Sequence, residues 1–259
     1  MFKFTVITSN IRFDNPADGE HDWHNRRKLL ACAINGYHPD IIGTQEGWQP
    51  QLKDLEGLLQ GLKIVEENRQ WIDDRMYPSI YYRPSKFKLI HSGDIWLSET
   101  PYIAASKSFG SAFPRVCTWA ILEARANNKK FFVVNAHLDH LKTNTRQEQI
   151  NVLINEINRL RSDYPVILTG DFNESPFEQV RSIINQRIPE LIDPWLEHKH
   201  EECESHHSFK GQREDGSRID WILCSKDKLK CEEILMHKEE SDGIYPSDHF
   251  PVVATISAK

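Results

Sequence analysis

Residues 165–173 read Pro165-Val166-Ile167-Leu168-Thr169-Gly170-Asp171-Phe172-Asn173, an apolar run that ends in Gly-Asp-Phe-Asn. The apolar part is too short for a helix and is bounded by proline and glycine, which predicts a buried strand. Side chains two residues apart in a strand share a face, so Asp171 and Asn173 are expected to point the same way. A carboxylate and an amide so placed suit a divalent cation, an activated water or a phosphoryl group. A simple turn explains the same residues equally well.

Other apolar runs of the chain also adjoin polar residues of the same kind. The runs cover residues 4–8, 41–43, 131–134, 219–223 and 250–253. The polar residues that end, interrupt or precede them are Asn10, Gln45-Glu46, Asn135-Ala136-His137, Asp220 and Ser247-Asp248-His249. One such ending is explained by a turn, but their recurrence predicts a site at which several strand ends meet.

Composition limits the partners of the chain. Its 259 residues contain no linker, repeat or low-complexity block, which predicts a single domain over residues 1–259. The formal net charge of −6 argues against a large footprint on duplex nucleic acid. A short strand or a small phosphate ester remains compatible with that charge.

Cysteine usage and the N-terminal sequence indicate the compartment. The five cysteines show no C-x-x-C spacing, and Cys32, Cys117 and Cys224 lie in apolar runs, which predicts buried thiols and no disulfide framework. The N-terminus has no apolar signal core, and no run is long enough to span a bilayer. We therefore expect a cytoplasmic protein without a transmembrane segment.

Helical and strand patterns alternate along the chain. Helices are expected over residues 23–35, from 52 to 59 with Gly61 closing the helix, over 145–160, and from Pro176 with Ser175 as the N-cap. Further strands are expected over residues 80–82, 87–90 and 116–123. This mixture predicts an α/β or α+β sandwich.

The polar motifs together resemble those of the endonuclease/exonuclease/phosphatase superfamily, in order and rough spacing, from Asn10 to Val253. The motifs are Asn10, Gln45-Glu46, Asn135-Ala136-His137-Leu138, Gly170-Asp171-Phe172-Asn173, Ile219-Asp220 and Ser247-Asp248-His249. The resemblance implies a four-layer α/β/β/α sandwich with two packed mixed β-sheets, as in deoxyribonuclease I. It also implies hydrolysis of phosphate esters, dependent on Mg²⁺ or Mn²⁺, by in-line attack of water on phosphorus.

Details of the motifs divide the superfamily into branches. The motif at residues 135–138 makes the chain similar to the deadenylase, sphingomyelinase and deoxyribonuclease I-like branches. The chain is less similar to apurinic-site endonucleases, which carry an acid where Arg12 stands. It also lacks the Cys-Asp-Arg triplet of inositol polyphosphate 5-phosphatases. It most resembles a group of compact bacterial hydrolases, through Asn10-Ile11-Arg12, Arg115 with Thr118-Trp119-Ala120, and residues 245–252.

The resemblance implies a metal site. Glu46 is expected to hold Mg²⁺ or Mn²⁺ through its carboxylate, with Asn10 nearby and Asp248 completing the shell through water. Magnesium keeps several waters and needs few protein carboxylates, so one firm acidic ligand is enough. Asn173 is expected to hold water or a phosphoryl oxygen.

The expected catalytic groups surround the attacking water. Asp171 is expected to orient or deprotonate this water. His137 and His249 are expected to donate hydrogen bonds to the charged oxygens of the transition state. Alternatively, His249 is itself the base, with Asp220 or Asp248 fixing its tautomer. The sequence leaves this choice of base open.

Three further residues are expected to contact the substrate. Arg115 opens a strand and offers the planar donor fork that suits phosphate, although an ordinary surface arginine explains it as well. Arg12 stands two residues from Asn10 and is a candidate phosphate or substrate contact on the same terms as Arg115. Asp139 shares a face with His137 if the strand continues, and a turn would break that relation.

Two other groups of residues invite functional interpretations. One histidine-rich segment matches no closed zinc site and predicts a solvated loop that can form a pocket rim: His198, His200, Cys203, His206 and His207. Trp119 and Trp221 are expected in the core. The tryptophans to test for base stacking are Trp23, Trp48 and Trp96.

These residues predict a metal-dependent phosphoesterase that cleaves a phosphodiester in a short nucleic acid or nucleotide. The alternative substrate is a small-molecule, sugar or lipid-headgroup phosphate, as a monoester or a diester. A phosphate-binding module without catalysis is a third hypothesis. The complete set of ligand and water-activating residues argues against it. The sequence identifies no protein partner.

Overall fold

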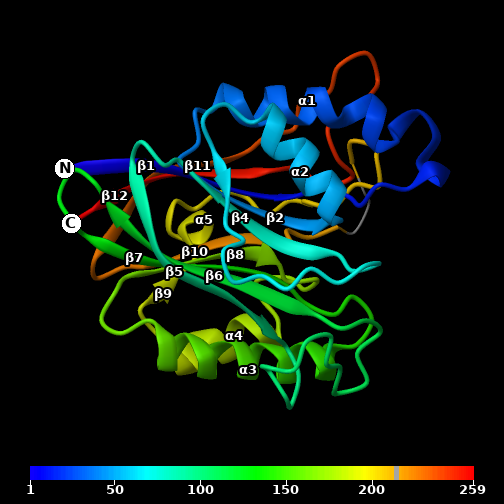
Figure 1. The fold of residues 1–259 in the computed structure, drawn as a ribbon. Coiled ribbons are helices and arrows are strands. Elements are labelled where there is room, and N and C mark those ends of the chain that lie inside the picture. The colour runs from blue at the N-terminus through cyan, green and yellow to red at the C-terminus, as the bar shows by residue number, and fades with distance from the viewer. Residues whose placement is uncertain (213–215) are drawn as a thin grey trace.

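Two β-sheets packed face to face form the centre of the computed structural model, which describes residues 1–212 and 216–259 (Figure 1). The first sheet contains β1 (Phe2–Asn10), β2 (Ile41–Gly47), β3 (Lys63–Ile64), β4 (Tyr77–Tyr82), β11 (Leu229–Met236) and β12 (Val252–Ala258). The second contains β5 (Phe87–Trp96), β6 (Val116–Ala124), β7 (Lys130–His137), β8 (Val166–Asp171), β9 (Leu191–Ile192) and β10 (Asp220–Ser225). The strand orders are β11-β12-β1-β2-β4-β3 and β5-β6-β7-β8-β10-β9.

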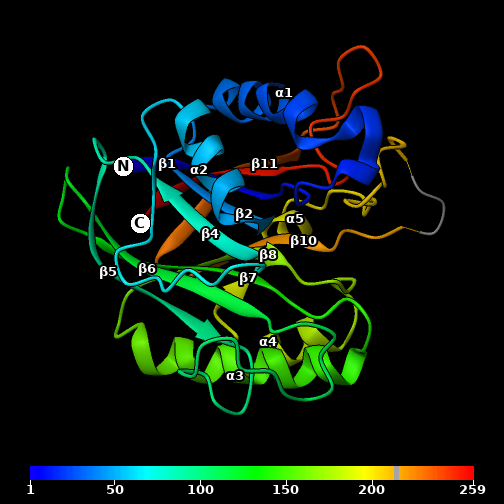
Figure 2. The same ribbon diagram turned by 45° about the vertical axis from the view of Figure 1, so that its right-hand side comes forward.

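Helices cover the outer face of each sheet (Figures 1 and 2). On the first sheet lie α1 (Trp23–Gly36) and α2 (Gln49–Leu58), and on the second lie α3 (Thr143–Leu160) and α4 (Gln179–Arg187). The short helices η1 (Pro16–His21) and α5 (Pro194–Glu197) lie in connections. The predicted four-layer α/β/β/α sandwich with two mixed sheets is therefore confirmed.

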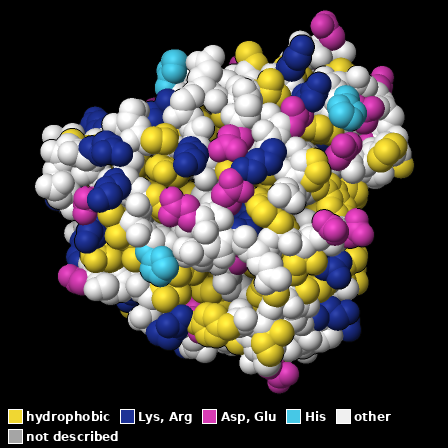
Figure 3. All heavy atoms as spheres, in the orientation of Figure 1, with side chains coloured by type: hydrophobic (Ala, Val, Ile, Leu, Met, Phe, Trp, Pro, Cys, Tyr) yellow, Lys and Arg dark blue, Asp and Glu magenta, His cyan; other side chains and the backbone are white. Residues whose placement is uncertain are grey.

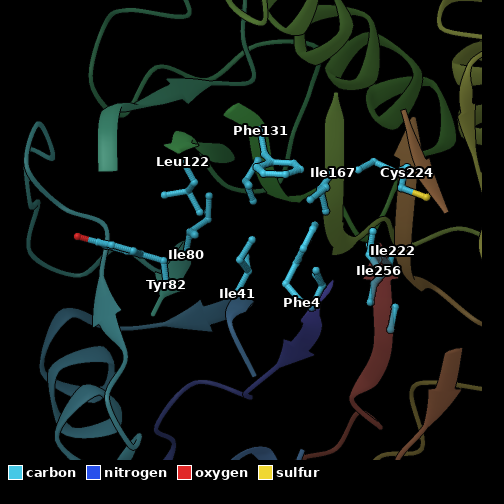
Figure 4. Close-up of a cluster of buried hydrophobic side chains, with 14 of the residues drawn as sticks. Phe4, Ile41, Ile80, Tyr82, Leu122, Phe131, Ile167, Ile222, Cys224 and Ile256 are labelled. Atoms are coloured by element: carbon cyan, nitrogen blue, oxygen red, sulfur yellow. The ribbon is translucent and has the colours of Figure 1, made fainter. Parts of the chain in front are cut away.

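The apolar runs form buried strands because both faces of each sheet are covered. Along β8, Ile167 belongs to the cluster between the sheets, whereas Val166 and Leu168 belong to the cluster beneath α3 and α4. Figure 4 shows the inter-sheet cluster, in which Phe4 of β1 and Phe131 of β7 lie among aliphatic side chains from both sheets. The alternation follows from the two-residue period of a strand.

The strand directions gather the polar ends at one end of the sandwich. β1 pairs in parallel with β2 in one sheet, and β7 pairs in parallel with β8 in the other. A hydrogen bond from Asn10 Nδ2 at the end of β1 to Asp171 Oδ2 at the end of β8 brings the carboxyl ends of the two pairs together. In these ladders Asn10 is paired with Gln45, and His137 with Asp171. Both chain termini lie at the opposite end (Figure 1). The predicted convergence of strand ends is thus a property of the topology.

Some local predictions are wrong. The helix expected from Pro176 begins at Gln179 with Glu178 at its N-cap, because residues 175–178 form a turn in which the Glu178 N–H donates to the Ser175 carbonyl (3.1 Å). Cys32 is exposed, whereas Cys117 and Cys224 are buried as predicted. Among the residues described, no helix has both the length and the apolar character needed to cross a bilayer.

The sheets approach each other closely at Gly43 in β2. A Cβ atom there would lie 2.3 Å from Thr169 Oγ1 and 2.7 Å from Asn135 Oδ1 of the second sheet. We expect Gly43→Ala to lower the free energy of unfolding by about 1–3 kcal/mol, because overpacking shifts buried groups. Denaturant unfolding checks this value. The matched control is Gly57→Ala in α2, where a Cβ meets no atom within 4 Å, and equal effects of both changes would contradict the argument.

Candidate active site

Three residues at the strand ends have left-handed backbone conformations. The φ angles are 69° at Glu46, 52° at Arg12 and 51° at Asn173. The pairing of β2 with β4 shifts register between Thr44 and Gly47, so Glu46 lies in a bulge that redirects its side chain. Such conformations cost about 1–3 kcal/mol each and concentrate at functional sites. Other non-glycine residues away from these strand ends also have positive φ, so the backbone conformation agrees with the sequence motifs but does not by itself identify the site.

Asn10 links the carboxylates of the two sheets. Its Nδ2 donates to Glu46 Oε1 (3.1 Å) and to Asp171 Oδ2 (2.9 Å), and its Oδ1 accepts from the Arg12 N–H (3.0 Å). The backbone N–H of Arg12 fixes the orientation of the Asn10 amide. A flipped amide would place its own NH2 group against the Arg12 N–H, so that two donors would face each other. The amide nitrogen of Asn10 thus faces the carboxylates.

Asp171 occupies the centre of the site and is 1 % exposed. Its Oδ1 accepts from the Asn173 N–H (2.9 Å), while its Oδ2 lies 3.5 Å from His137 Nε2 and 3.9 Å from His249 Nε2. The chain leaves the strand after Asp171, so Asn173 does not share a strand face with it. Instead, a side chain-to-backbone turn brings the two residues together. Both interpretations of this stretch, the turn and the site, therefore describe the same structure.

His249 is held by an acidic residue and a serine. Its Nδ1–H donates to Asp220 Oδ2 (2.8 Å), which also accepts from Ser205 Oγ (2.7 Å). Ser205 is fully buried and its Oγ accepts from the Ile219 N–H (2.9 Å), which fixes the hydroxyl. This arrangement leaves His249 Nε2 facing Asp171. Sequence reasoning missed Ser205, which stands in no recognised motif.

The charges of the site shift its pKa values. Burial, and then the charge of Asp220, raise the pKa of Asp171 to about 7. Burial opposes protonation of His249, but the carboxylates of Asp220, Asp248 and Asp171 outweigh it and raise the His249 pKa to about 10. Burial, and then the charge of Arg115, hold the pKa of His137 well below its usual value. At neutral pH the site therefore combines a charged His249 with a neutral His137.

The acidic and histidine groups are able to bind a divalent ion. Ligand atoms of Glu46, His137 and Asp171 all lie within 4.8 Å of one another. Glu46 is only half-buried, so its carboxylate is accessible to an ion that retains waters. The carboxylates suit Mg²⁺ or Mn²⁺, and the imidazole is also acceptable to Mn²⁺.

Asp248 lies in a different cluster from Glu46. Its Oδ2 is 3.9 Å from both Arg12 Nε and His206 Nε2, and its possible partners for an ion are His206 and His249. The structure therefore does not bring Asp248 into the group around Glu46.

The expected substrate contacts occupy different environments. Arg115 is 8 % exposed, and its Nη2 donates to His140 Nδ1 (3.3 Å). It lines a pocket together with Glu46 and His137. Arg12 lies at the other side of Glu46 and forms an ion pair with Asp18 (3.0 Å).

Asp139 differs from its predicted role as a substrate contact. β7 ends at His137, so the two residues do not share a strand face. Asp139 is fully buried, and its carboxylate accepts hydrogen bonds from the N–H groups of Ala112 (2.9 Å), Leu141 (2.9 Å) and Lys142 (3.0 Å). Burial raises its pKa, but these bonds outweigh burial and lower it. These contacts give Asp139 a structural role in organising the loops beside Arg115.

The histidine-rich segment is only partly solvated. His198 and His200 are exposed, as predicted. However, His207 is 1 % exposed and stacks on Phe250, with ring centroids 3.9 Å apart. His206 packs on His249, with centroids 4.6 Å apart. The end of this segment therefore packs against the site, whereas His198 and His200 are solvated as predicted.

The tryptophans also separate by burial. Trp23 and Trp96 are 2 % and 5 % exposed and belong to the core, so the stacking role considered for them is wrong. Trp119 and Trp221 are buried as predicted. Trp48 is half-buried and lines a second pocket, which shares Asp74 and Arg75 with the first. Trp48 is thus the one of the three candidates that a ligand can reach.

Comparisons with known proteins agree with this geometry. The model of the Endonuclease/Exonuclease/phosphatase family matches residues 7–249. An endonuclease/exonuclease/phosphatase from Bacteroides vulgatus has 25 % identity and a TM-score of 0.92, with 100 % of each chain covered. A mannosyl-6-phosphatase from Bacteroides thetaiotaomicron has 28 % identity and a TM-score of 0.88, with 98 % of this chain and 99 % of that chain covered.

A curated relative, nocturnin of Drosophila melanogaster, is 24 % identical over 89 % of this chain and 41 % of that protein. The chain spans between 41 % and 60 % of the length of the curated relatives that it matches.

Proposed function

Because the chain belongs to the endonuclease/exonuclease/phosphatase family, we propose that it is a divalent-metal-dependent phosphoesterase in which water attacks phosphorus in line. The observation that carries this proposal is the environment of Asp171. This buried carboxylate is held by Asn10 and the Asn173 N–H. It faces two histidines, of which His249 is charged and His137 is neutral at neutral pH. We also propose that residues 1–259 act as one catalytic domain.

The pKa values favour one of the two candidate bases. A general base works best when its pKa is close to the operating pH, as the pKa of about 7 at Asp171 is. His249 has a pKa of about 10, so it carries its proton at neutral pH. We therefore assign Asp171 to the attacking water. His249 Nε2–H is assigned as a hydrogen-bond donor to a phosphoryl oxygen, with Asp220 and Ser205 as positioning residues.

The remaining groups bind the charged phosphate. Neutral His137 is assigned to donate to a second phosphoryl oxygen, and Asn173 to hold water or phosphate. Glu46 would hold Mg²⁺ or Mn²⁺, with Asn10 positioning its carboxylate, and Asp248 lies further away. When bound, this ion supplies Lewis-acid stabilisation of the negative charge on the phosphoryl oxygens.

The first candidate substrate is a phosphodiester in a short nucleic acid or nucleotide. Trp48 offers a reachable aromatic surface for a base in the second pocket, which shares Asp74 and Arg75 with the pocket that contains Glu46. Acidic and basic side chains are interspersed on the face shown in Figure 3, and the net charge is −6, so a long duplex is not favoured.

A specific observation favours a second candidate, a small phosphate monoester. The full-length structural relative at 28 % identity is a mannosyl-6-phosphatase. Arg115 is buried in the pocket beside Glu46, where a guanidinium suits the two charges of a terminal phosphate. The two candidates share the same hydrolytic centre and differ in the group that the pocket accepts.

A model-substrate assay tests the function and separates the candidates. Bis-(p-nitrophenyl) phosphate and p-nitrophenyl phosphate are each incubated with Mg²⁺, Mn²⁺ or EDTA. Turnover that requires metal supports the proposal, and the preferred compound identifies a diesterase or a monoesterase. Failure of both compounds with every metal, together with calorimetry that detects no Mg²⁺ binding, would overturn it.

Glu46→Gln is expected to raise the Mg²⁺ concentration needed for half-maximal activity by about tenfold or more, because the accessible carboxylate is lost. Activity is measured across a magnesium titration. The matched control is Glu67→Gln, an exposed residue for which the titration curve is expected to stay unchanged. An unchanged curve for Glu46→Gln would place the ion elsewhere.

A further inference from the structure

The pocket beside Glu46 contains two arginines. It lies between the segment before β4 and the segment before β6. Its lining residues are Glu46, Asp74, Arg75, Met76, Pro78, Phe113, Pro114, Arg115, Val116 and His137. A ligand held at Glu46 and His137 therefore extends directly towards both guanidinium groups.

Both guanidinium groups have unused donors. The Nε atoms of Arg75 and Arg115 are buried and have no hydrogen-bond partner within the described part of the chain. Arg75 donates through Nη1 only to the carbonyl of its neighbour Asp74 (3.0 Å), and Arg115 donates through Nη2 to His140 (3.3 Å). Neither side chain forms an ion pair with residues 1–212 or 216–259.

Other buried arginines show the usual arrangement. Arg69, Arg146 and Arg218 each contact a carboxylate, at 2.8, 2.7 and 2.6 Å respectively. Arg115 has a buried guanidinium without such a partner, which costs free energy unless an anion binds to it. Arg75 is half-buried, and its Nε is the enclosed donor. One unpaired arginine is not by itself a site, since Arg181 on α4 also has unused donors. The inference depends on two of them converging in one pocket that also contains Glu46 and His137.

The two arginines occupy successive positions along the two adjoining pockets. The charges of Glu46, Asp171 and Asp139 act on Arg115, which places it at the hydrolytic end. Arg75 instead lines both this pocket and the next one, of about 920 Å³, which leads to Trp48. Each planar fork matches one phosphate or carboxylate, so two forks in sequence match two anionic groups in sequence.

We propose that Arg75 forms an anion subsite that binds a second phosphoryl group of the substrate, next to the cleaved phosphate that Arg115 contacts. The proposal rests on the proposed function for the position of the cleaved phosphate. It defines the substrate class as a nucleotide or sugar with two neighbouring phosphoryl groups. The rest of such a substrate extends towards Trp48.

Calorimetric titration at fixed free Mg²⁺ tests the subsite with two probes, inorganic phosphate and the non-hydrolysable methylenebisphosphonate. The wild-type protein is expected to bind the bisphosphonate about tenfold or more tightly than phosphate, as one charge-assisted contact allows. Arg75→Gln is expected to remove this preference. Arg75→Lys keeps the charge without the fork and is expected to restore only part of it. The matched control Lys88→Gln, at an exposed position of β5, is expected to keep the full preference.

The outcomes separate the subsite from the hydrolytic function. Equal affinity for the two anions, no binding of either anion, or an unchanged preference in Arg75→Gln would overturn the subsite, even if p-nitrophenyl esters are hydrolysed. A preference that depends on Arg75 in a protein that hydrolyses no ester would support the subsite and count against the proposed function.

Discussion

Replacing Asp171 with asparagine is expected to lower kcat by about 10²–10⁴-fold, the usual contribution of a positioned general base. The carboxylate is held by the Asn173 N–H (2.9 Å) and by Asn10 Nδ2 (2.9 Å), so its orientation towards the water is fixed before substrate binds. An asparagine fills the same volume but cannot accept a proton. The measurement is steady-state hydrolysis of the preferred p-nitrophenyl ester with saturating metal.

The same replacement is expected to change the stability of the fold only slightly. The folded-state pKa of Asp171, about 7, lies above its ordinary value of 3.8. The unfolded chain therefore loses this proton first, and between pH 4 and 7 the group makes folding less favourable as the pH rises. A neutral asparagine removes that penalty. However, the asparagine NH2 replaces one of the two accepting oxygens, so the hydrogen bond from Asn10 Nδ2 or from the Asn173 N–H is lost. Because the two effects oppose each other, thermal unfolding of the metal-free protein at pH 8 is expected to give a melting temperature close to that of the wild type.

Two results would contradict this assignment of Asp171. One is retention of wild-type kcat, which would transfer the role of base to His249. The other is a large fall in melting temperature, which would attribute the loss of activity to the fold. Asp163→Asn serves as the matched control, because its side chain is 99 % exposed and far from the chemistry.

The sandwich and most of the site residues could be predicted because they depend on short stretches. β8 combines an apolar run with a Gly-Asp ending inside nine residues, and parallel pairing then brings such endings together. The predicted residues that converge are those that stand directly at strand ends, such as Glu46, His137 and Asp171. Local pattern and sheet direction together account for this part of the site.

The remaining part depends on contacts between distant segments, which no local pattern records. Ser205 reaches Asp220 across 15 positions of the chain, and Arg75 enters the pocket from a loop without a motif. The amide orientation of Asn10 is set by a single backbone N–H, which sequence does not reveal. The prediction that Asp139 contacts substrate requires the strand to continue past His137, but β7 ends at His137 and Asp139 is fully buried. Proximity to a motif residue is therefore a weaker guide than position at a strand end.

Asp220→Asn is expected to move the whole pH–activity profile towards lower pH and to lower kcat at pH 8 by about 10²–10⁴-fold. The charge of Asp220 raises two pKa values at once, those of Asp171 and His249. Activity requires Asp171 without its proton, so it rises with pH through the lower pKa. It also requires His249 with its proton, so it falls as the pH rises through the upper pKa, about 10 in the wild type. Removing one negative charge lowers both values, and both limbs therefore shift in the same direction.

Ser205→Ala provides the matched control for this shift. The change removes the hydroxyl that donates to Asp220 Oδ2 (2.7 Å) but keeps the carboxylate, so the limbs of its profile are expected to stay close to those of the wild type. NMR titration of the His249 ring gives a readout that does not depend on turnover, and Asp220→Asn is expected to lower the midpoint. A fall in kcat with both limbs unmoved would show that Asp220 acts by holding the ring in place. If only the alkaline limb moves, the charge of Asp220 does not affect the pKa of Asp171. In that case one carboxylate does not set both protonation states.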